Sequence, residues 1–394
     1  NCYNTGNVTG TTAGGLCMIN DGTIRNCYNT GNVTGTTAGG LCGDNYSTIR
    51  NCYNTGNVTG TTAGGLCGLN YSTITNCYNI GSVTGSGNGN IYAGGVCGNN
   101  DSSDRQNTIT NCYNTGSVTV SVTGSGNGNI CAGGVCGYNN RGTITNCYWL
   151  NSVLVGIGGS HEGSTANNVE SKTNDQFASG EVAWLLNRYQ ENGPWRQTLA
   201  ADDYPVLDNN HKEVVKLTVD STVSYLNKGD SFSGVEGIGY YLDGEMVELP
   251  YTVEADTVLT AKTLYVVTVD GVVSYVDPNE PVFKLPAAPS RSGYTFVHWS
   301  DGTNTYDPGD SVPVTGNVTF TAVWQAINIP DPNGITVTQP ENGTVKVNPS
   351  NGSAGTLITV TATPDEGYEL AYITVVGEKI TGNTFKMPDK SVTV

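Results

Sequence analysis

The sequence has almost no charge in its first 150 residues. They contain four aspartates, four arginines and no lysine or glutamate, whereas the whole chain of 394 residues carries a formal net charge of -17. All of the net negative charge therefore lies after residue 150. An acidic half repels the phosphates of nucleic acids and of anionic lipids, and the chain has no cluster of lysine or arginine that could bind them. We expect no nucleic-acid partner.

Long apolar runs are also missing. The sequence has no stretch of about 18 apolar residues, so no segment is expected to insert into a membrane. The first residues do not form a charged and then apolar signal segment. The chain starts at Asn1 in the middle of a repeat and ends inside a predicted strand. We interpret it as a fragment whose export signal and any anchor lie outside it.

Histidine is scarce, and no catalytic motif occurs in its required setting. The three histidines are His161, His211 and His298. “HEGST” lacks the second histidine and the helix of a zinc protease, and no nucleophile elbow or phosphate-binding loop is found. “DGTNTYDPGD” fits no EF-hand spacing and is interpreted as turns. Two acidic pairs are interpreted as acidic surface rather than glycosidase residues: Asp202 with Asp203, and Asp307 with Asp310. We expect no enzyme activity, cofactor or metal.

What the sequence does contain is a repeat. Its copies follow at periods of 25 and then 35 residues, beginning at Asn1, Asn26, Asn51, Asn76, Asn111 and Asn146. Each copy holds three short β-type stretches separated by glycine, asparagine and threonine. The density of glycine and the absence of a helical apolar period exclude helices. The repeat predicts a parallel β-solenoid (β-helix) over residues 1–150, with successive coils about 4.8 Å apart.

Equivalent residues of successive coils should stack in columns. Two inward cysteine columns are predicted: Cys2, Cys27, Cys52, Cys77, Cys112 and Cys147, and then Cys17, Cys42, Cys67, Cys97 and Cys136. Isoleucine and valine should form further inward columns, starting at Ile24 and Val8. An amide ladder is expected at one corner, from Asn26, Asn51, Asn76, Asn111 and Asn146. Strand alternation leaves the direction of Leu16, Leu41 and Leu66 open.

The cysteines allow three interpretations. A zinc site needs closely spaced pairs, which the spacing of 15 residues within a regular coil does not provide. Disulfides are possible because the count of 12 is even, but stacked inward thiols also behave as small hydrophobic groups. We favour buried free thiols. Cys131 breaks the column pattern and is the candidate for an exposed or irregularly paired thiol.

Two groups of residues are candidates for a binding surface. A column of outward tyrosines would offer flat aromatic surfaces to glycans, although tyrosine on a strand is also ordinary β propensity. “GSGNGNI” is inserted at the same point in two coils, so it should project as neighbouring loops, as a binding face or as a tolerated polar bulge. The candidate residues are Tyr28, Tyr53, Tyr78, Tyr113, Asn88, Asn90, Asn127 and Asn129.

The repeat resembles the GLUG motif of bacterial surface and secreted proteins. “AGGLCG” or “AGGVCG”, then “GTITNCY” and “TGSVTG”, carry the resemblance over about the first 150 residues. GLUG repeats occur in adhesin-like proteins and beside IgA-cleaving metallopeptidases. The resemblance implies location and architecture more than chemistry.

Residues 151–212 are predicted to form a capping and linker subdomain with a short helix. Thr173 and Gln176 have capping-box spacing, and Ser179 could cap a second turn. One helical face is expected to carry Val182, Leu185, Leu186 and Tyr189. Solenoid ends expose unpaired strand edges, which such a segment could cover.

Three β modules are predicted after the cap. Residues 264–326 resemble the Listeria-Bacteroides repeat, of internalin B type with a β-grasp-like fold, through Gly293, Tyr294, Phe296, Trp299 and Trp324. Residues 213–263 look like a degenerate copy without the tryptophan. Residues 327–394 resemble a divergent internalin B-type repeat, truncated at its end, through “NGTV” and “FKMPDKSVTV”. Such modules act as stalks, spacers or partner-binding domains.

Together these features favour a non-catalytic adhesin-like protein of the bacterial cell surface or one that is secreted. The solenoid would present a binding face to host or microbial glycans or proteins, and the repeat modules would be spacers. Two alternatives stay open. The chain could be the accessory region of a larger secreted enzyme, such as a metallopeptidase, whose catalytic domain lies outside the fragment. “TGTT” at Thr9, Thr34 and Thr59 could also form flat threonine ladders of an ice-binding solenoid.

Overall fold

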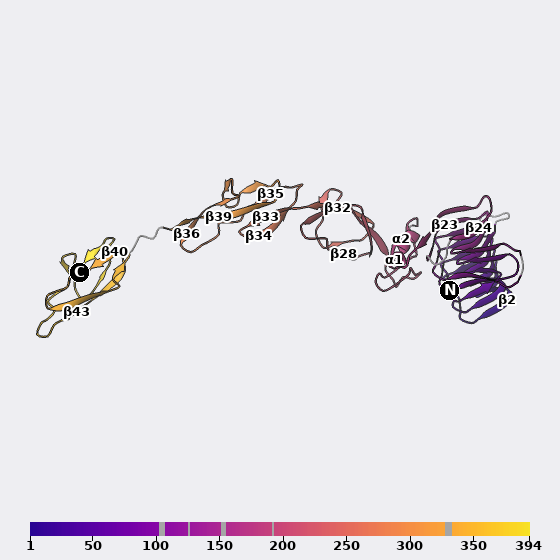
Figure 1. Ribbon diagram of the computed structural model, residues 1–394, viewed down its shortest axis with the longest axis horizontal. Helices are drawn as coiled ribbons and strands as arrows, with labels where there is room; N and C mark the ends of the chain where they lie inside the picture. Colours follow the sequence, from indigo (N-terminus) through magenta and orange to yellow (C-terminus); the bar gives the residue numbers. More distant parts are fainter. Residues whose placement is uncertain (102–106, 125–126, 151–154, 191–192, 328–332) are drawn as a thin grey trace. The chain divides into compact units, whose positions relative to one another are not determined.

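The computed structural model describes residues 1–101, 107–124, 127–150, 155–190, 193–327 and 333–394 (Figure 1). The chain forms two compact units, residues 1–264 and residues 265–394, and each is described by itself. Both units consist mainly of β-strands, and unit 1 begins with a parallel β-solenoid, so the predicted fold class is confirmed. The helices in the described part of the chain are too short to span a bilayer.

Three parallel sheets form the solenoid. Sheet 1 contains β1 (Tyr3–Asn4), β5 (Tyr28–Asn29), β9 (Tyr53–Asn54), β14 (Tyr78–Asn79), β19 (Tyr113–Asn114), β4 (Thr23–Arg25), β8 (Thr48–Arg50), β13 (Thr73–Thr75), β18 (Thr108–Thr110), β23 (Thr143–Leu150) and β25 (Thr165–Lys172). Sheet 2 contains β2 (Val8–Gly14), β6 (Val33–Gly39), β10 (Val58–Gly60), β11 (Thr62–Gly64), β15 (Val83–Gly87), β16 (Ile91–Gly94), β20 (Val118–Val122) and β21 (Ile130–Gly133). Sheet 3 contains β3 (Cys17–Asn20), β7 (Cys42–Asn45), β12 (Cys67–Asn70), β17 (Cys97–Asp101), β22 (Cys136–Asn140) and β24 (Ile157–Ser160).

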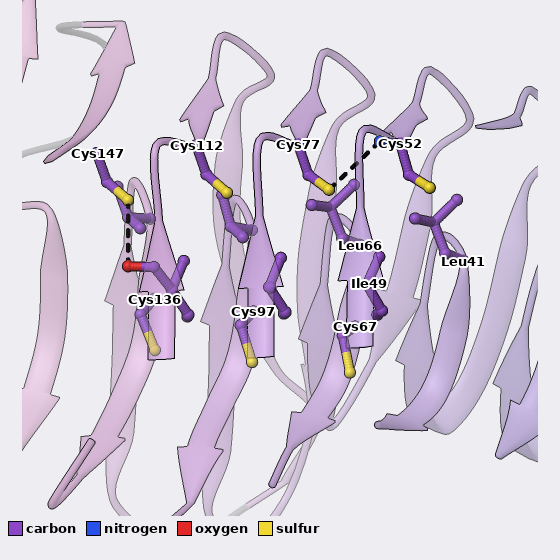
Figure 2. Close-up of a cluster of buried hydrophobic side chains, with 14 of the residues drawn as sticks. Leu41, Ile49, Cys52, Leu66, Cys67, Cys77, Cys97, Cys112, Cys136 and Cys147 are labelled. Atoms are coloured by element: carbon purple, nitrogen blue, oxygen red, sulfur yellow. Dashed lines mark hydrogen bonds between the residues drawn. The ribbon is translucent and has the colours of Figure 1, made fainter. Parts of the chain in front are cut away.

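The two cysteine columns and the isoleucine column fill the solenoid core, as predicted, except that Cys2 in the first coil is exposed. Figure 2 shows Cys52, Cys77, Cys112 and Cys147 in one row and Cys67, Cys97 and Cys136 in a second row across the core. The isoleucine column, from Ile49 to Ile144, is buried in the same cluster. Because each coil repeats the same inward residues in register, the core continues unbroken from coil to coil.

A pair of glycines before each leucine explains why Leu41 and Leu66 point into the core. Leu66 and Cys67 are adjacent in sequence, yet both side chains are fully buried. The preceding Gly64 and Gly65 make this possible, because a Cβ at Gly65 would collide with the backbone oxygen of Gly95 and with the side chain of Asn79. The chain therefore turns a tight corner before Leu66, and simple strand alternation does not hold there.

Sheet 2 bends into a narrow lobe with its own small core. The valine column packs against an alanine column that lies five residues further along each regular coil, as Val58 does with Ala63. The outer surface of this lobe carries threonine, and its tip is where the longer coils have their insertions. The lobe is thus thin and strongly repetitive.

The predicted asparagine ladder was placed on the wrong residues. Asn26, Asn51, Asn76, Asn111 and Asn146 all have a φ between 51° and 55°, so they supply the left-handed corner between two strands. Among the described residues of this column, the only hydrogen bond between side-chain amides runs from Asn146 to Asn111. The ladders lie in two other columns: Asn4, Asn29, Asn54, Asn79 and Asn114, and Asn20, Asn45, Asn70, Asn100 and Asn139.

The solenoid continues beyond the predicted boundary at residue 150. β24 pairs with β22 in sheet 3, and β25 pairs with β23 in sheet 1, so each of these two sheets gains one more strand. Residues 151–154 of the predicted cap lie outside the described residues. Two short helices follow instead of one, α1 (Asn174–Ala178) and α2 (Glu181–Asn187). The capping box of Thr173 and Gln176 is confirmed, whereas Ser179 is the C-cap of α1 and the N-cap of α2 is Gly180.

Unit 1 ends with a mixed β module. Its strands are β26 (Val214–Val219), β27 (Thr222–Asn227), β28 (Ser231–Phe232), β29 (Ile238–Leu242), β30 (Glu245–Met246), β31 (Tyr251–Thr252) and β32 (Thr257–Thr263). The main sheet has the order β27-β26-β32-β29-β30, in which β26 and β32 are parallel. Trp184 of α2 donates its indole N–H to Asp256 of this module at 2.8 Å.

Unit 2 starts with a module of the same topology. Its strands are β33 (Tyr265–Val269), β34 (Val272–Val276), β35 (Val282–Lys284), β36 (Tyr294–Ser300), β37 (Thr305–Tyr306), β38 (Ser311–Pro313) and β39 (Val318–Ala326), in the sheet order β34-β33-β39-β36-β37. Asp220 and Asp270 occupy equivalent left-handed hairpin turns. Tyr240 and Trp299 are both buried, and each lies opposite an alanine of the neighbouring antiparallel strand. The shared topology explains the predicted degenerate copy.

The remaining strands of unit 2 form the last module. They are β40 (Asn333–Thr336), β41 (Gly343–Asn348), β42 (Asn351–Gly352), β43 (Leu357–Pro364), β44 (Thr374–Val375), β45 (Glu378–Lys379), β46 (Thr384–Lys386) and β47 (Val392–Thr393). Residues 328–332, at the start of the predicted module, lie outside the described residues.

Candidate functional site

The predicted tyrosine column is a stacked ladder. Ring centroids are 5.3 Å apart from Tyr3 to Tyr28, 5.0 Å from Tyr28 to Tyr53, 4.9 Å from Tyr53 to Tyr78 and 5.0 Å from Tyr78 to Tyr113, and the rings lie within 8° of parallel. In-register pairing of the coils sets this spacing. Each ring face is therefore covered by its neighbours, and the ladder presents ring edges and hydroxyl groups. The prediction that these tyrosines offer flat aromatic surfaces to a glycan is wrong.

The cap covers half of the ladder. Tyr78 is 8% exposed, and Tyr113 and Tyr148 are 1% exposed, because they pack against apolar side chains of the cap. The ring centroid of Trp195 lies 6.0 Å from that of Tyr78 and 5.4 Å from that of Tyr113. The placement of Tyr78 and Tyr113 on a ligand-binding surface is therefore wrong, whereas Tyr28 and Tyr53 remain half-exposed.

Hydrogen bonds hold the cap to the solenoid corner beside the ladder. The Tyr113 hydroxyl donates to the backbone oxygen of Pro205 at 2.6 Å. The amides of Asn76 and Asn146, in the left-handed corner column, donate to Gln190 at 3.0 Å and to the backbone oxygen of Leu185 at 3.1 Å. Burial raises the pKa of Tyr113 well above its usual value, so its hydroxyl stays protonated and can donate this hydrogen bond.

We expect Tyr113→Phe to lower the free energy of unfolding of the cap by about 1.5 kcal/mol, because the buried oxygen of Pro205 loses its donor. Tyr28→Phe is the matched control. Its ring belongs to the same ladder but is half-exposed, so we expect a change within about 0.5 kcal/mol. Denaturant titration followed by tryptophan fluorescence would measure both. Equal effects of the two substitutions would contradict the role of the buried hydroxyl.

The inserted loops lie side by side at the tip of the lobe, as predicted. Asn88, Asn90, Asn127 and Asn129 are all exposed, and the backbone N–H of Asn129 donates to the side-chain oxygen of Asn90 at 2.9 Å. Residues 125 and 126 of the second loop lie outside the described residues. The loops thus bring exposed amide groups from two neighbouring coils together.

Two rows of hydroxyl groups run along the lobe toward these loops. The first row is in register and contains Thr9, Thr34, Thr59, Thr84 and Thr119. The second row, two residues further along each strand, contains Thr11, Thr36, Thr61, Ser86 and Ser121. The hydroxyl oxygens of Thr84 and Thr119 are 3.3 Å apart. The rows and loops form a neutral surface of hydroxyl and amide groups, which we call the lobe surface.

The cysteines are structural. All twelve are free thiols, and the sulfur atoms of Cys42 and Cys67 are 3.8 Å apart in the core. Burial raises the pKa of Cys67 well above its usual value, which makes this thiol unreactive. Cys131 is half-buried in register with Tyr92, and the exposed cysteine is Cys2.

The histidine and acidic side chains with shifted pKa values take part in local hydrogen bonds. His211 contacts Asp208 at 2.6 Å, and this bond raises the pKa of His211 above its usual value at the surface of the cap. The carboxylate of Asp301 accepts backbone N–H groups of Asn304 and Thr303 in a turn, which lowers its pKa. In the described parts of the chain, no group of three or more histidine, cysteine or acidic side chains could hold a metal ion.

Three segments of the chain match models of repeat families. Residues 35–59, one period of the solenoid, match the GLUG motif. Residues 268–323 match the Listeria-Bacteroides repeat domain, and residues 333–394 match the divergent InlB B-repeat domain. The order and type of these matches agree with the sequence prediction. Such repeats are typical of bacterial surface or secreted proteins. None of the curated proteins compared with the chain matches it.

Proposed function

We propose that the chain is part of an adhesin-like protein of the bacterial surface or one that is secreted. The solenoid presents the lobe surface to a ligand, and the β modules after it act as spacers. The repeat types support the location, since they are typical of surface or secreted proteins. The rigid in-register coils support the role of the solenoid, because they hold identical side chains at a constant spacing over many residues.

The observation that carries the proposal is the chemistry of the lobe surface. It combines rows of threonine hydroxyls with exposed loop amides, and charged side chains are absent from its sequence. Hydroxyl and amide groups donate and accept hydrogen bonds without a net charge, which suits the hydroxyl-rich surface of a neutral glycan. Binding would be a sum of weak contacts repeated along the coils, and several copies on a cell would add avidity.

A glycan array and a mucin pull-down test this proposal. We expect the chain to bind, and we expect alanine at Asn88, Asn90, Asn127 and Asn129 together to weaken binding at least about tenfold, since each substitution removes a donor and an acceptor. Alanine at Thr260, an exposed strand position on the module of unit 1, is the control and should leave binding unchanged. Absence of binding by the unmodified chain, or equal binding by the loop variant, would contradict the proposal.

A second candidate function is ice binding, which the in-register row of Thr9, Thr34, Thr59, Thr84 and Thr119 favours. Flat, regularly spaced threonine rows on one face could order water. Thermal hysteresis of the purified chain is the measurement, and its absence would remove this candidate. The remaining alternative, an accessory region of a larger secreted enzyme, predicts a catalytic domain in the same reading frame. Sequencing the gene on both sides would test it.

A further inference from the structure

The tyrosine ladder continues past the cap without a change of geometry. Tyr3, Tyr28 and Tyr53 stack at about the same spacing as the covered Tyr78 and Tyr113. Tyr3 is 66% exposed, however, and Tyr28 and Tyr53 are half-exposed. We call these three residues the open rungs. They present the same ring edges and hydroxyl groups that the cap buries on the other half of the ladder. The open rungs are therefore a continuation of an interface that the molecule already uses.

The covered half shows what kind of chemistry fits a rung. Aromatic rings meet the ladder at its edge, with Phe177 5.6 Å and Trp195 5.4 Å from the ring centroid of Tyr113. The backbone oxygen of Pro205 accepts a hydrogen bond from the Tyr113 hydroxyl. The occupant is thus a polypeptide segment with aromatic side chains. Residues 173–207, which supply it, contain five acidic and two basic residues.

The open half differs from the covered half in charge. Arg25 and Arg50 lie opposite each other in register, and both are exposed. The same column holds threonine in the covered coils, at Thr75, Thr110 and Thr145. Within the described residues neither arginine has an ion-pair partner. Two like charges on neighbouring strands repel each other, and a carboxylate between them would relieve this.

The arginines are placed where an occupant of the open rungs would reach them. Each arginine directly precedes the left-handed asparagine of its coil, and the cap hydrogen-bonds to that asparagine in two of the covered coils, at Asn76 and Asn146. A segment that docked on the open rungs in the same manner would bring its polar groups beside Arg25 and Arg50. Acidic residues are the side chains that fit there.

We propose that the open rungs, with Arg25 and Arg50, are a docking site for an acidic polypeptide segment with aromatic side chains, supplied by a partner protein. The aromatic rings of this segment lie against the ring edges of Tyr28 and Tyr53, and its backbone oxygens accept hydrogen bonds from the tyrosine hydroxyls. Its carboxylates form ion pairs with the two arginines. The inference rests on the proposed role as a surface binding protein, and it uses a different face from the lobe surface.

Selection of peptides from a random display library against the full chain tests this proposal. We expect the enriched peptides to combine aspartate or glutamate with tryptophan, phenylalanine or tyrosine. A selected peptide should bind Arg25→Glu/Arg50→Glu at least about tenfold more weakly, because both ion pairs become repulsive, and Tyr28→Ser should also weaken binding. Arg141→Glu changes the charge of another exposed solenoid arginine and should have no effect. Circular dichroism of each variant would show that the coils remain folded.

Three results would overturn the proposal. One is enrichment of peptides without acidic and aromatic residues, or no enrichment at all. Another is equal binding of the selected peptides to the unmodified chain and to the double arginine variant. The third is binding of an acidic glycan, such as heparin, that is lost in the double variant while no peptide binds. The loop variant of the lobe surface should keep peptide binding, so failure of glycan binding and failure of this proposal are separate outcomes.

Discussion

Alanine in place of Gly65 should destabilise the solenoid by about 3 kcal/mol. Its Cβ would collide with the backbone oxygen of Gly95 in the next coil and with the side chain of Asn79. Neither group can move freely, because one belongs to a paired backbone and the other to the amide ladder. Denaturant titration followed by circular dichroism would measure the change in the midpoint of unfolding.

Gly22→Ala is the matched control for this prediction. Gly22 lies in a turn of the first coil, and a Cβ there would meet nothing within 4 Å. We expect its effect on the midpoint to correspond to less than about 0.5 kcal/mol. If the two alanine variants unfolded at the same midpoint, the close approach of neighbouring coils at Gly65 would not be what the glycine is needed for.

Asn54→Asp should cost about 3 kcal/mol at neutral pH, and part of this loss should be recovered in acid. The amide of Asn54 donates to Asn79 at 2.8 Å and to the backbone oxygen of Gly56 at 2.7 Å, and its oxygen accepts from Asn29 at 2.8 Å. An ionised aspartate keeps only the accepting role, so two buried oxygens would face a negative charge. The protonated carboxyl can donate one bond again.

The sign of the pH dependence follows from this difference. Burial and the facing oxygens raise the pKa of an aspartate at position 54 in the folded state above its unfolded value of about 3.9. The stability of the variant relative to the unmodified chain should therefore rise as the pH falls through the folded-state pKa, and level off below about 3.9. Urea titrations of both proteins between pH 8 and pH 4 would show this.

Asn57→Asp is the control for the ladder. Asn57 is exposed, and its side-chain oxygen accepts from the backbone N–H of Ser82 at 3.1 Å, a role that aspartate can also fill. We expect a change of less than about 0.5 kcal/mol at any of these pH values. A loss of stability at position 54 that did not depend on pH would contradict the assignment of the donated bonds.

Much of the solenoid could be predicted because a repeat determines contacts between coils. Residues at one period must stack, so the sequence predicts the cysteine, isoleucine and valine columns and the stacking of tyrosines. The candidate site was harder to predict. The stacking that puts Tyr28 over Tyr53 also covers their ring faces, a consequence that the sequence analysis missed. The repeated asparagines at Asn29 and Asn45 carried a signal for the true ladders, since they recur at the same period as the corner column.

The sequence by itself determined the solenoid, its period and in-register columns, and the identity of the β modules, because these depend on patterns that recur along the chain. The tertiary structure decided which asparagines form hydrogen-bonded ladders and which occupy left-handed corners. It also decided that Leu66 and Cys67 both face inward. It also decided that the ladder is buried at Tyr113 and open at Tyr28. The tyrosine that recurs in each coil carries no sign of this difference, because the residues that cover Tyr113 come from a cap segment about 60 to 90 positions later in the chain.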